Sequence, residues 1–137
     1  MSRIWAIIPV KPLANAKSRL APALTPTQRQ QLAEQMFRHV LEISTSVPQL
    51  AGTLVISRDN KALAIAREYG AKTVQESGAP EMNAALMRAT SLIARWRGSG
   101  VLILPADLPL VTTYVVVSMV EMGDDLYSVV IATDQVR

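Results

Sequence analysis

The chain has no cysteine, one histidine and few aromatic residues, which make up 4% of its 137 residues. Without cysteine it can form neither disulfides nor thiolate metal centres, and a reducing compartment is permitted. Because His39 is the only histidine, metal sites with several imidazole ligands are excluded. The lack of cysteine excludes a Cys-His catalytic set, and no Ser-His-Asp set can be assembled from the motifs of the chain. The scarcity of aromatic residues leaves aliphatic side chains to fill the core.

Long apolar runs and strong net charge are also missing. No run approaches the roughly 20 apolar residues of a membrane span, and Ile4–Val10 is too short for a signal-peptide core and is broken by Pro9. Fourteen basic and eleven acidic residues give a net charge of +3, which is too small to indicate nucleic-acid binding. We therefore expect one cytoplasmic domain over residues 1–137, with neither a membrane nor a nucleic acid as partner.

Short apolar segments alternate with segments of helical periodicity. Continuous apolar runs are typical of strands buried on both faces of a parallel sheet. Such strands are predicted at Trp5–Val10, Thr53–Ser57, Lys72–Gln75, Val101–Leu104 and Ser128–Ala132. The alternation predicts an α/β fold with a mostly parallel sheet and right-handed crossovers.

Helix boundaries are marked by capping residues. Thr25-Pro-Thr-Gln28 has the pattern of a capping box, with proline at the first helical position. Two further helices are predicted at Lys61–Tyr69 and Asn83–Arg97, closed by Gly70 and Gly98 respectively. Thr112–Met122 stays open, because its threonine start favours a helix whereas Tyr114-Val-Val-Val117 favours a strand.

The segment Pro9–Leu20, Pro-Val-Lys-Pro-Leu-Ala-Asn-Ala-Lys-Ser-Arg-Leu, follows the first predicted strand. Loops at the carboxyl ends of strands bind phosphorylated ligands in open α/β sheets. Lys11, Lys17 and Arg19 would supply the positive charge that a nucleoside triphosphate requires. The alternative is a solvated surface loop, and the glycine patterns of common phosphate loops are absent.

A carboxylate follows the fourth predicted strand. Asp107 lies between Pro105 and Pro109, which stiffen the turn. One carboxylate at this position suits Mg²⁺, which takes its remaining oxygen ligands from water and phosphates. The alternative is a turn aspartate that accepts hydrogen bonds from local amides.

Three polar residues are weaker candidates. Asn83 either caps a helix or uses its amide to bind a base or a ribose. Ser57 and Asp59 follow the second predicted strand, and the local pattern favours a turn and a helix cap.

These motifs together resemble the 2-phospho-L-lactate guanylyltransferase family, whose bacterial members are phosphoenolpyruvate guanylyltransferases of deazaflavin coenzyme biosynthesis. The resemblance lies in four motifs in the same order: Pro9–Leu20, Val55-Ile-Ser-Arg-Asp59, Met82-Asn-Ala-Ala-Leu86 and Leu104-Pro-Ala-Asp-Leu-Pro109. It implies a three-layer, Rossmann-like fold with helices on both faces of the sheet, as in nucleotide-diphospho-sugar transferases.

The resemblance also implies a reaction and roles for these residues. GMP would pass from GTP to a small phosphorylated acid, which is 2-phospholactate, phosphoenolpyruvate or 3-phosphoglycerate, and pyrophosphate would leave. Lys11, Lys17 and Arg19 would hold the triphosphate, and Asp107 would bind Mg²⁺. Ser57, Asp59 and Asn83 would lie on the guanosine side. The neighbouring motif residues assigned to the nucleotide are Pro9, Val10, Ser18, Ala84 and Pro105.

Similar proteins continue beyond the equivalent of Arg137, so we expect this domain to lack a carboxyl-terminal part of the family fold. Apolar segments such as Tyr114–Val120 would then be exposed, which predicts a homo-oligomer, in the simplest case a dimer. The alternative to an active guanylyltransferase is a truncated module that binds nucleotide or dimerises without turnover.

Overall fold

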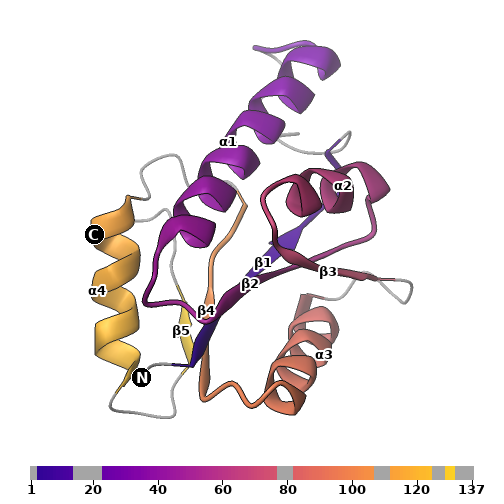
Figure 1. Cartoon of the computed structure of the whole chain (residues 1–137). Coiled ribbons are helices and arrows are strands. Elements are labelled where there is room, and N and C mark those ends of the chain that lie inside the picture. Colours follow the sequence, from indigo (N-terminus) through magenta and orange to yellow (C-terminus); the bar gives the residue numbers. More distant parts are fainter. Residues whose placement is uncertain (1–2, 14–22, 77–81, 107–111, 125–128, 132–137) are drawn as a thin grey trace.

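The apolar runs form the strands of one parallel sheet. The computed structural model describes residues 3–13, 23–76, 82–106, 112–124 and 129–131 (Figure 1). The five strands of this part of the chain are β1 (Ile4–Val10), β2 (Gly52–Ser57), β3 (Lys72–Gln75), β4 (Gly100–Ile103) and β5 (Val129–Ile131). Their order is β3-β2-β1-β4-β5, and every pairing between neighbours is parallel. The predicted α/β class and parallel sheet are confirmed.

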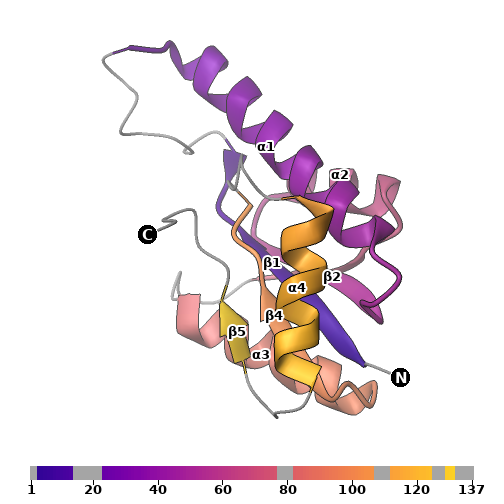
Figure 2. The same ribbon diagram turned by 90° about the vertical axis from the view of Figure 1, so that its left-hand side faces the viewer.

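Helices cover both faces of the sheet. They are α1 (Pro26–Ser46), α2 (Asn60–Glu68), α3 (Met82–Arg95) and α4 (Thr113–Asp124). Figures 1 and 2 show α1, α2 and α4 on one face and α3 on the other, which gives the three layers that the resemblance implied. None of the helices in the described ranges combines the length and apolarity that crossing a bilayer requires.

The alternation of side chains along β1 explains why both faces are covered. Ile4, Ala6 and Ile8 join the core beneath α1, α2 and α4, whereas Trp5 and Ile7 join the core beneath α3. Since successive side chains of a strand point to opposite faces, a strand that is apolar throughout needs helices on both sides. β1 is the central strand, and the two cores meet there.

One crossover departs from the expected handedness. The β1–α1–β2 and β2–α2–β3 units move across the sheet in one direction on one face, and β3–α3–β4 moves back on the other face, so these three share one hand. The β4–α4–β5 unit moves in the same direction as β3–α3–β4, but α4 lies on the face of α1 and α2. Its hand is therefore opposite to that of the other three, and the expectation of uniformly right-handed crossovers is wrong.

The open question over residues 112–122 is resolved in favour of a helix, α4. Val116 and Val120, four residues apart, are buried in the core with α1, whereas Tyr114 is 80% exposed. Packing of this i, i+4 pair outweighs the strand propensity of the valines.

The ends of α2 and α3 show two uses of glycine. Gly70 ends α2 with a φ of 81°, as predicted. At the end of α3 the left-handed residue is Arg97, with a φ of 63°, and not Gly98. Gly98 is favoured for a different reason, because a Cβ atom there would collide with the Ile93 side chain and make a tight contact with Trp5. The helix closes as a Schellman motif, in which the Gly98 N–H donates to the Ile93 carbonyl at 2.9 Å.

Gly52 provides space for a tryptophan pair at the amino edge of the sheet. The Trp5 and Trp96 rings pack with centroids 5.1 Å apart, and a Cβ atom on Gly52 would lie 2.5 Å from Trp5 Cζ3. We expect Gly52→Ala to lower the free energy of unfolding by about 1–3 kcal/mol, the usual cost of overpacking. Urea unfolding followed by circular dichroism would measure the change.

A double mutant tests this cause. In a Trp5→Leu background the added methyl meets no indole ring, so Gly52→Ala should cost far less there than in the parent chain. Equal costs in the two backgrounds would contradict the steric explanation.

Candidate active site

The predicted site residues come from one edge of the sheet. The strand order reverses between β1 and β4, and ligands of open α/β sheets bind outside the carboxyl ends of the strands at such a point. The segments that follow β1 and β4 are those assigned to the triphosphate and to Mg²⁺. The strand pairing therefore brings the starts of both segments together.

Pro9 lies where the pairing of β1 with β4 ends. β1 pairs with β4 as far as Ile7, whose carbonyl accepts from Leu104 N–H, and with β2 as far as Val10. Backbone groups two residues apart in a strand point to the same side, so the N–H that Pro9 lacks would point toward β4 beyond Ile103. The β1–β4 ladder therefore ends where proline provides no further donor.

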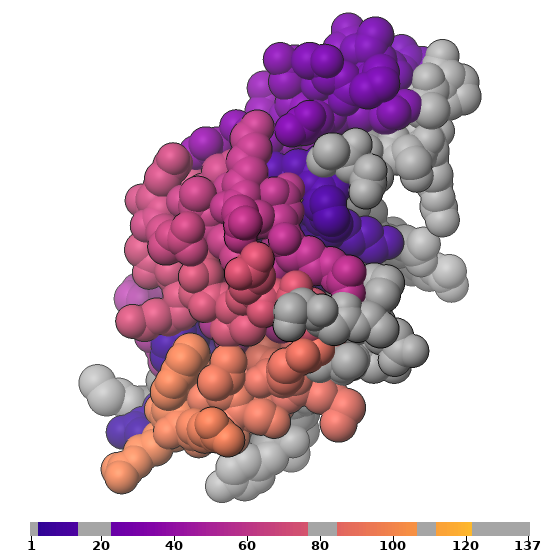
Figure 3. Space-filling model, turned by 90° about the vertical axis from the view of Figure 1, so that its right-hand side faces the viewer, coloured from indigo at the N-terminus to yellow at the C-terminus, as the bar shows by residue number. Residues whose placement is uncertain are grey.

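Lys11 is exposed and lies between two fixed points. Before it, the Val10 side chain is buried in the core, and after it the Leu13 side chain is buried and only 2% exposed. Pro12 lies between Lys11 and Leu13 and restricts the backbone further. In Figure 3 the indigo end of β1 reaches the surface between the purple atoms of α1 and the magenta atoms of the β2–α2 region.

The β2–α2 turn binds this segment at both ends. Ser57 Oγ donates to the Val10 carbonyl at 2.8 Å and accepts from Asp59 N–H at 3.0 Å. Asp59 Oδ2 accepts from Leu13 N–H, and its Oδ1 accepts from Lys61 N–H at the start of α2, both at 2.9 Å. The predicted helix cap at Asp59 is confirmed, and its second oxygen makes a contact 46 residues away in sequence.

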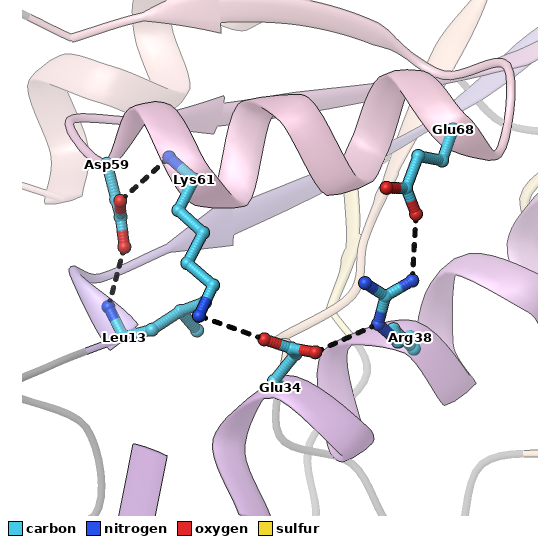
Figure 4. A network of polar contacts seen from close by, with 6 residues as sticks. All are labelled: Leu13, Glu34, Arg38, Asp59, Lys61 and Glu68. Carbon is cyan, nitrogen blue, oxygen red and sulfur yellow. Dashed lines mark hydrogen bonds and ion pairs between the residues drawn. The ribbon is translucent and has the colours of Figure 1, made fainter. Parts of the chain in front are cut away.

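Ion pairs connect α2 to α1 beside this turn (Figure 4). Glu34 of α1 pairs with Lys61 Nζ at 3.3 Å and with Arg38 Nε at 3.2 Å, and Arg38 continues to Glu68 at 2.9 Å. Burial opposes ionisation of Glu34, but hydrogen bonds from Arg38 and Lys61 outweigh it and lower the pKa of that carboxyl. The pKa of Arg38 is raised by its hydrogen bonds, first to Glu68. These partly exposed pairs link the two helices and add little to stability.

A buried acid, Glu76, lies at this edge and was not among the residues predicted from the sequence. The Glu76 side chain is 6% exposed and forms an ion pair with Arg88 of α3. Its backbone N–H donates to the Ser57 carbonyl at 2.8 Å, at the carboxyl end of β2. Only its position directly after β3 could have indicated that it is more than a turn residue.

The remaining site residues are placed in part. α3 begins at Met82, so Asn83 and Ala84 lie within its first turn and Asn83 is not its cap. Pro105 follows β4 and is partly exposed. Lys17, Ser18, Arg19 and Asp107 lie outside the described residues, so their assignments stay predictions.

The described residues contain no cluster of three or more acidic, histidine or cysteine side chains that could hold a metal ion. Mg²⁺ bound through one carboxylate and the phosphates of a nucleotide requires no such cluster. The assignment of Mg²⁺ to Asp107, which lies outside the described residues, therefore stays a prediction.

A family model described as "Guanylyl transferase CofC like" matches residues 4–136. The chain belongs to this family.

Curated relatives of this CofC-like chain are named as guanylyltransferases. The 2-phospho-L-lactate guanylyltransferase of Methanobrevibacter ruminantium is 37% identical over 122 residues, covering 81% of this chain and 51% of that protein. The phosphoenolpyruvate guanylyltransferase of Roseiflexus castenholzii is 40% identical over 107 residues, covering 78% of this chain and 49% of the relative. That of Rubrobacter xylanophilus is 35% identical over 139 residues, covering 98% and 64% respectively. The CofC-like chain thus spans about half the length of the first two relatives and somewhat more of the third.

A solved structure shares the fold. CMP:2-keto-3-deoxy-manno-octonic acid synthetase, complexed with CTP, superposes with a TM-score of 0.62 at 18% identity, covering 90% of this chain and 48% of that one. At this identity the likeness concerns the fold alone. It confirms the nucleotidyltransferase-type fold that the resemblance implied for the CofC-like chain.

Proposed function

We propose that the protein transfers GMP from GTP to a small phosphorylated acid, with release of pyrophosphate. The observation that carries this proposal is the match of residues 4–136 to the guanylyl transferase family. It is supported by relatives whose names specify 2-phospho-L-lactate or phosphoenolpyruvate as the acceptor, and 3-phosphoglycerate is a third candidate.

The proposed step is an in-line displacement. A phosphate oxygen of the acid attacks the α-phosphorus of GTP, a new P–O bond forms, and the bond to the β-phosphate breaks as pyrophosphate leaves. Such a reaction depends on positioning and on stabilising the developing charge. Lys11, exposed beyond β1, would contact the phosphates together with Lys17 and Arg19. Asp107 would bind Mg²⁺, which supplies further positive charge at the phosphates.

The guanosine side is assigned to Asn83 and its neighbour Ala84 in the first turn of α3. Ser57 was predicted there as well, but its hydroxyl is engaged at both donor and acceptor positions and the residue is 2% exposed. Both oxygens of Asp59 already accept backbone hydrogen bonds. Intramolecular roles are therefore favoured for these two residues.

Turnover can be measured with GTP labelled at the α-phosphate. We expect a labelled guanosine conjugate and pyrophosphate in the presence of Mg²⁺ and one of the three acids, and none with CTP in place of GTP. No product above background with any acceptor would reject catalysis by this polypeptide. Titration with GTP would then decide whether the chain is a nucleotide-binding module without turnover.

We also retain the expectations of cytoplasmic location and self-association. Two features are consistent with self-association: Tyr114 is 80% exposed, and Val115, Val117 and Met119 of α4 are only partly buried. Sedimentation at micromolar concentration tests it, and a clean monomer would contradict it.

A further inference from the structure

We propose that Asp59 is a positioning residue that fixes Lys11, with Ser57 as its support, and that neither side chain binds the nucleotide. This role rests on the proposed contact of Lys11 with the triphosphate. It assigns a function to the β2–α2 turn that the local cap pattern alone did not indicate.

The first argument is the placement of the hydrogen bonds around Lys11. Ser57 holds the Val10 carbonyl directly before it, and Asp59 holds the Leu13 N–H two residues after it. Ser57 also accepts from Asp59 N–H, so the two tethers are linked to each other. Two hydrogen bonds of 2.8 and 2.9 Å thus join a segment of four residues to the turn. Two more, of 3.0 and 2.9 Å, connect Ser57 with Asp59 inside the turn and Asp59 with the start of α2.

The second argument is the chemistry of Asp59. A helix cap needs a single side-chain oxygen, and serine or asparagine supplies it as well as aspartate does. Asp59 uses one oxygen to cap α2 through Lys61 N–H and the other to accept from Leu13 N–H, so the carboxylate places an acceptor at each of two separate donors. The tether therefore explains the second oxygen of aspartate, which the cap alone leaves without a role.

The third argument is that the turn itself is anchored. Lys61, the second residue of α2, forms an ion pair with Glu34 of α1, and Arg38 connects Glu34 to Glu68 at the other end of α2 (Figure 4). The Leu13 side chain is buried in the same core as α2. A tether on this support limits the positions that Lys11 can adopt, which lowers the entropic cost of ordering it around phosphates.

Asp59→Ser tests the tether directly. Serine keeps the cap of α2 but has one oxygen on a shorter side chain, so the Leu13 N–H loses its acceptor. We expect hydrogen exchange of the Leu13 amide to accelerate at least about tenfold, because local opening replaces a closed hydrogen bond. Gly52→Ala is the matched control, since it destabilises the chain at the opposite edge and leaves the tether intact.

Nucleotide binding tests the consequence for Lys11. We expect Asp59→Ser to weaken Mg²⁺–GTP binding about tenfold, the lower end of losses seen when a supporting side chain is removed. GMP binding should change little, because GMP lacks the β- and γ-phosphates. In a Lys11→Met background the same substitution should have almost no effect on GTP binding, since the group that it positions is gone.

Three results would overturn the proposal. Unchanged Leu13 exchange would show that there is no tether, and an equal loss of GTP and GMP affinity would place Asp59 in contact with the nucleoside. Additive effects of Asp59→Ser and Lys11→Met on GTP affinity would show that the two residues act independently. If the parent chain binds no GTP, the proposed nucleotide site fails, and Leu13 exchange alone then supports or overturns the tether.

Discussion

Replacing Asp107 with asparagine should reduce Mg²⁺-dependent GTP binding by at least about 100-fold, the upper end of losses for side chains that only support a ligand. Asparagine keeps the size of the side chain and one oxygen, but it removes the negative charge that favours a hard divalent cation. Asp107 follows β4 by four residues, beyond the strand, so we expect the substitution to leave the core intact. Calorimetric titration of GTP with and without Mg²⁺ measures the effect.

Glu42→Gln provides the matched control for this prediction. Glu42 is an exposed carboxylate of α1, and neutralising it changes the net charge of the chain by the same amount. We expect its GTP affinity to equal that of the parent chain. If Asp107→Asn and Glu42→Gln bind Mg²⁺–GTP equally well, Asp107 is not a metal ligand.

The largest loss of stability is expected for Phe37→Ala. Phe37 is fully buried in the centre of α1, in the core shared with β1, α2 and α4. Removing its ring leaves a cavity that aliphatic neighbours fill only in part, at a cost of about 3–5 kcal/mol. For a chain of 137 residues this corresponds to a fall in Tm of roughly 10–20 °C.

The neighbouring Gln35 serves as the control. It is exposed on the same helix, and Gln35→Ala should change the free energy of unfolding by less than about 0.5 kcal/mol. Thermal melts of both variants by circular dichroism provide the comparison. A fall in Tm below about 5 °C for Phe37→Ala would mean that α1 packs less tightly than described.

Local patterns predicted most of the fold. The capping box at Thr25 is present in both directions, with Gln28 N–H donating to Thr25 Oγ1 at 3.1 Å and Thr25 N–H donating to Gln28 Oε1 at 2.9 Å. Such caps depend on residues three apart, so the sequence contains the whole interaction. The buried strands were predictable for a similar reason, because continuous apolar runs have few other uses in a small α/β domain.

The features that were predicted wrongly or missed depend on contacts between residues far apart in the sequence. The face on which α4 packs depends on α1 and β5 together, so the reversed crossover could not be inferred from its own residues. Arg97 takes the left-handed position because Gly98 is favoured where a Cβ atom would collide with the Ile93 side chain. The hydrogen bond from Leu13 N–H to the second oxygen of Asp59 can form only when β1 and β2 are paired in register.

Contacts between distant residues also limited the prediction of the site. The sequence indicated that the segments after β1 and β4 would lie at the same edge, because strand ends share the carboxyl edge of a parallel sheet. That these two strands are neighbours comes from the structure. The sequence could not indicate that Ser57 would be buried, or that Glu76 would be buried and paired with Arg88. Both outcomes depend on how α2 and α3 pack on the sheet.

The tryptophan pair has a practical consequence for these experiments. Trp5 and Trp96 lie against each other near the start of β1 and the end of α3, and Trp5 is about 17 Å of strand away from Val10. All the indole fluorescence of the chain therefore originates at the edge opposite the proposed nucleotide site. Emission should report unfolding while remaining insensitive to GTP, so a single sample can be monitored for folding while its ligand affinity is measured by another signal.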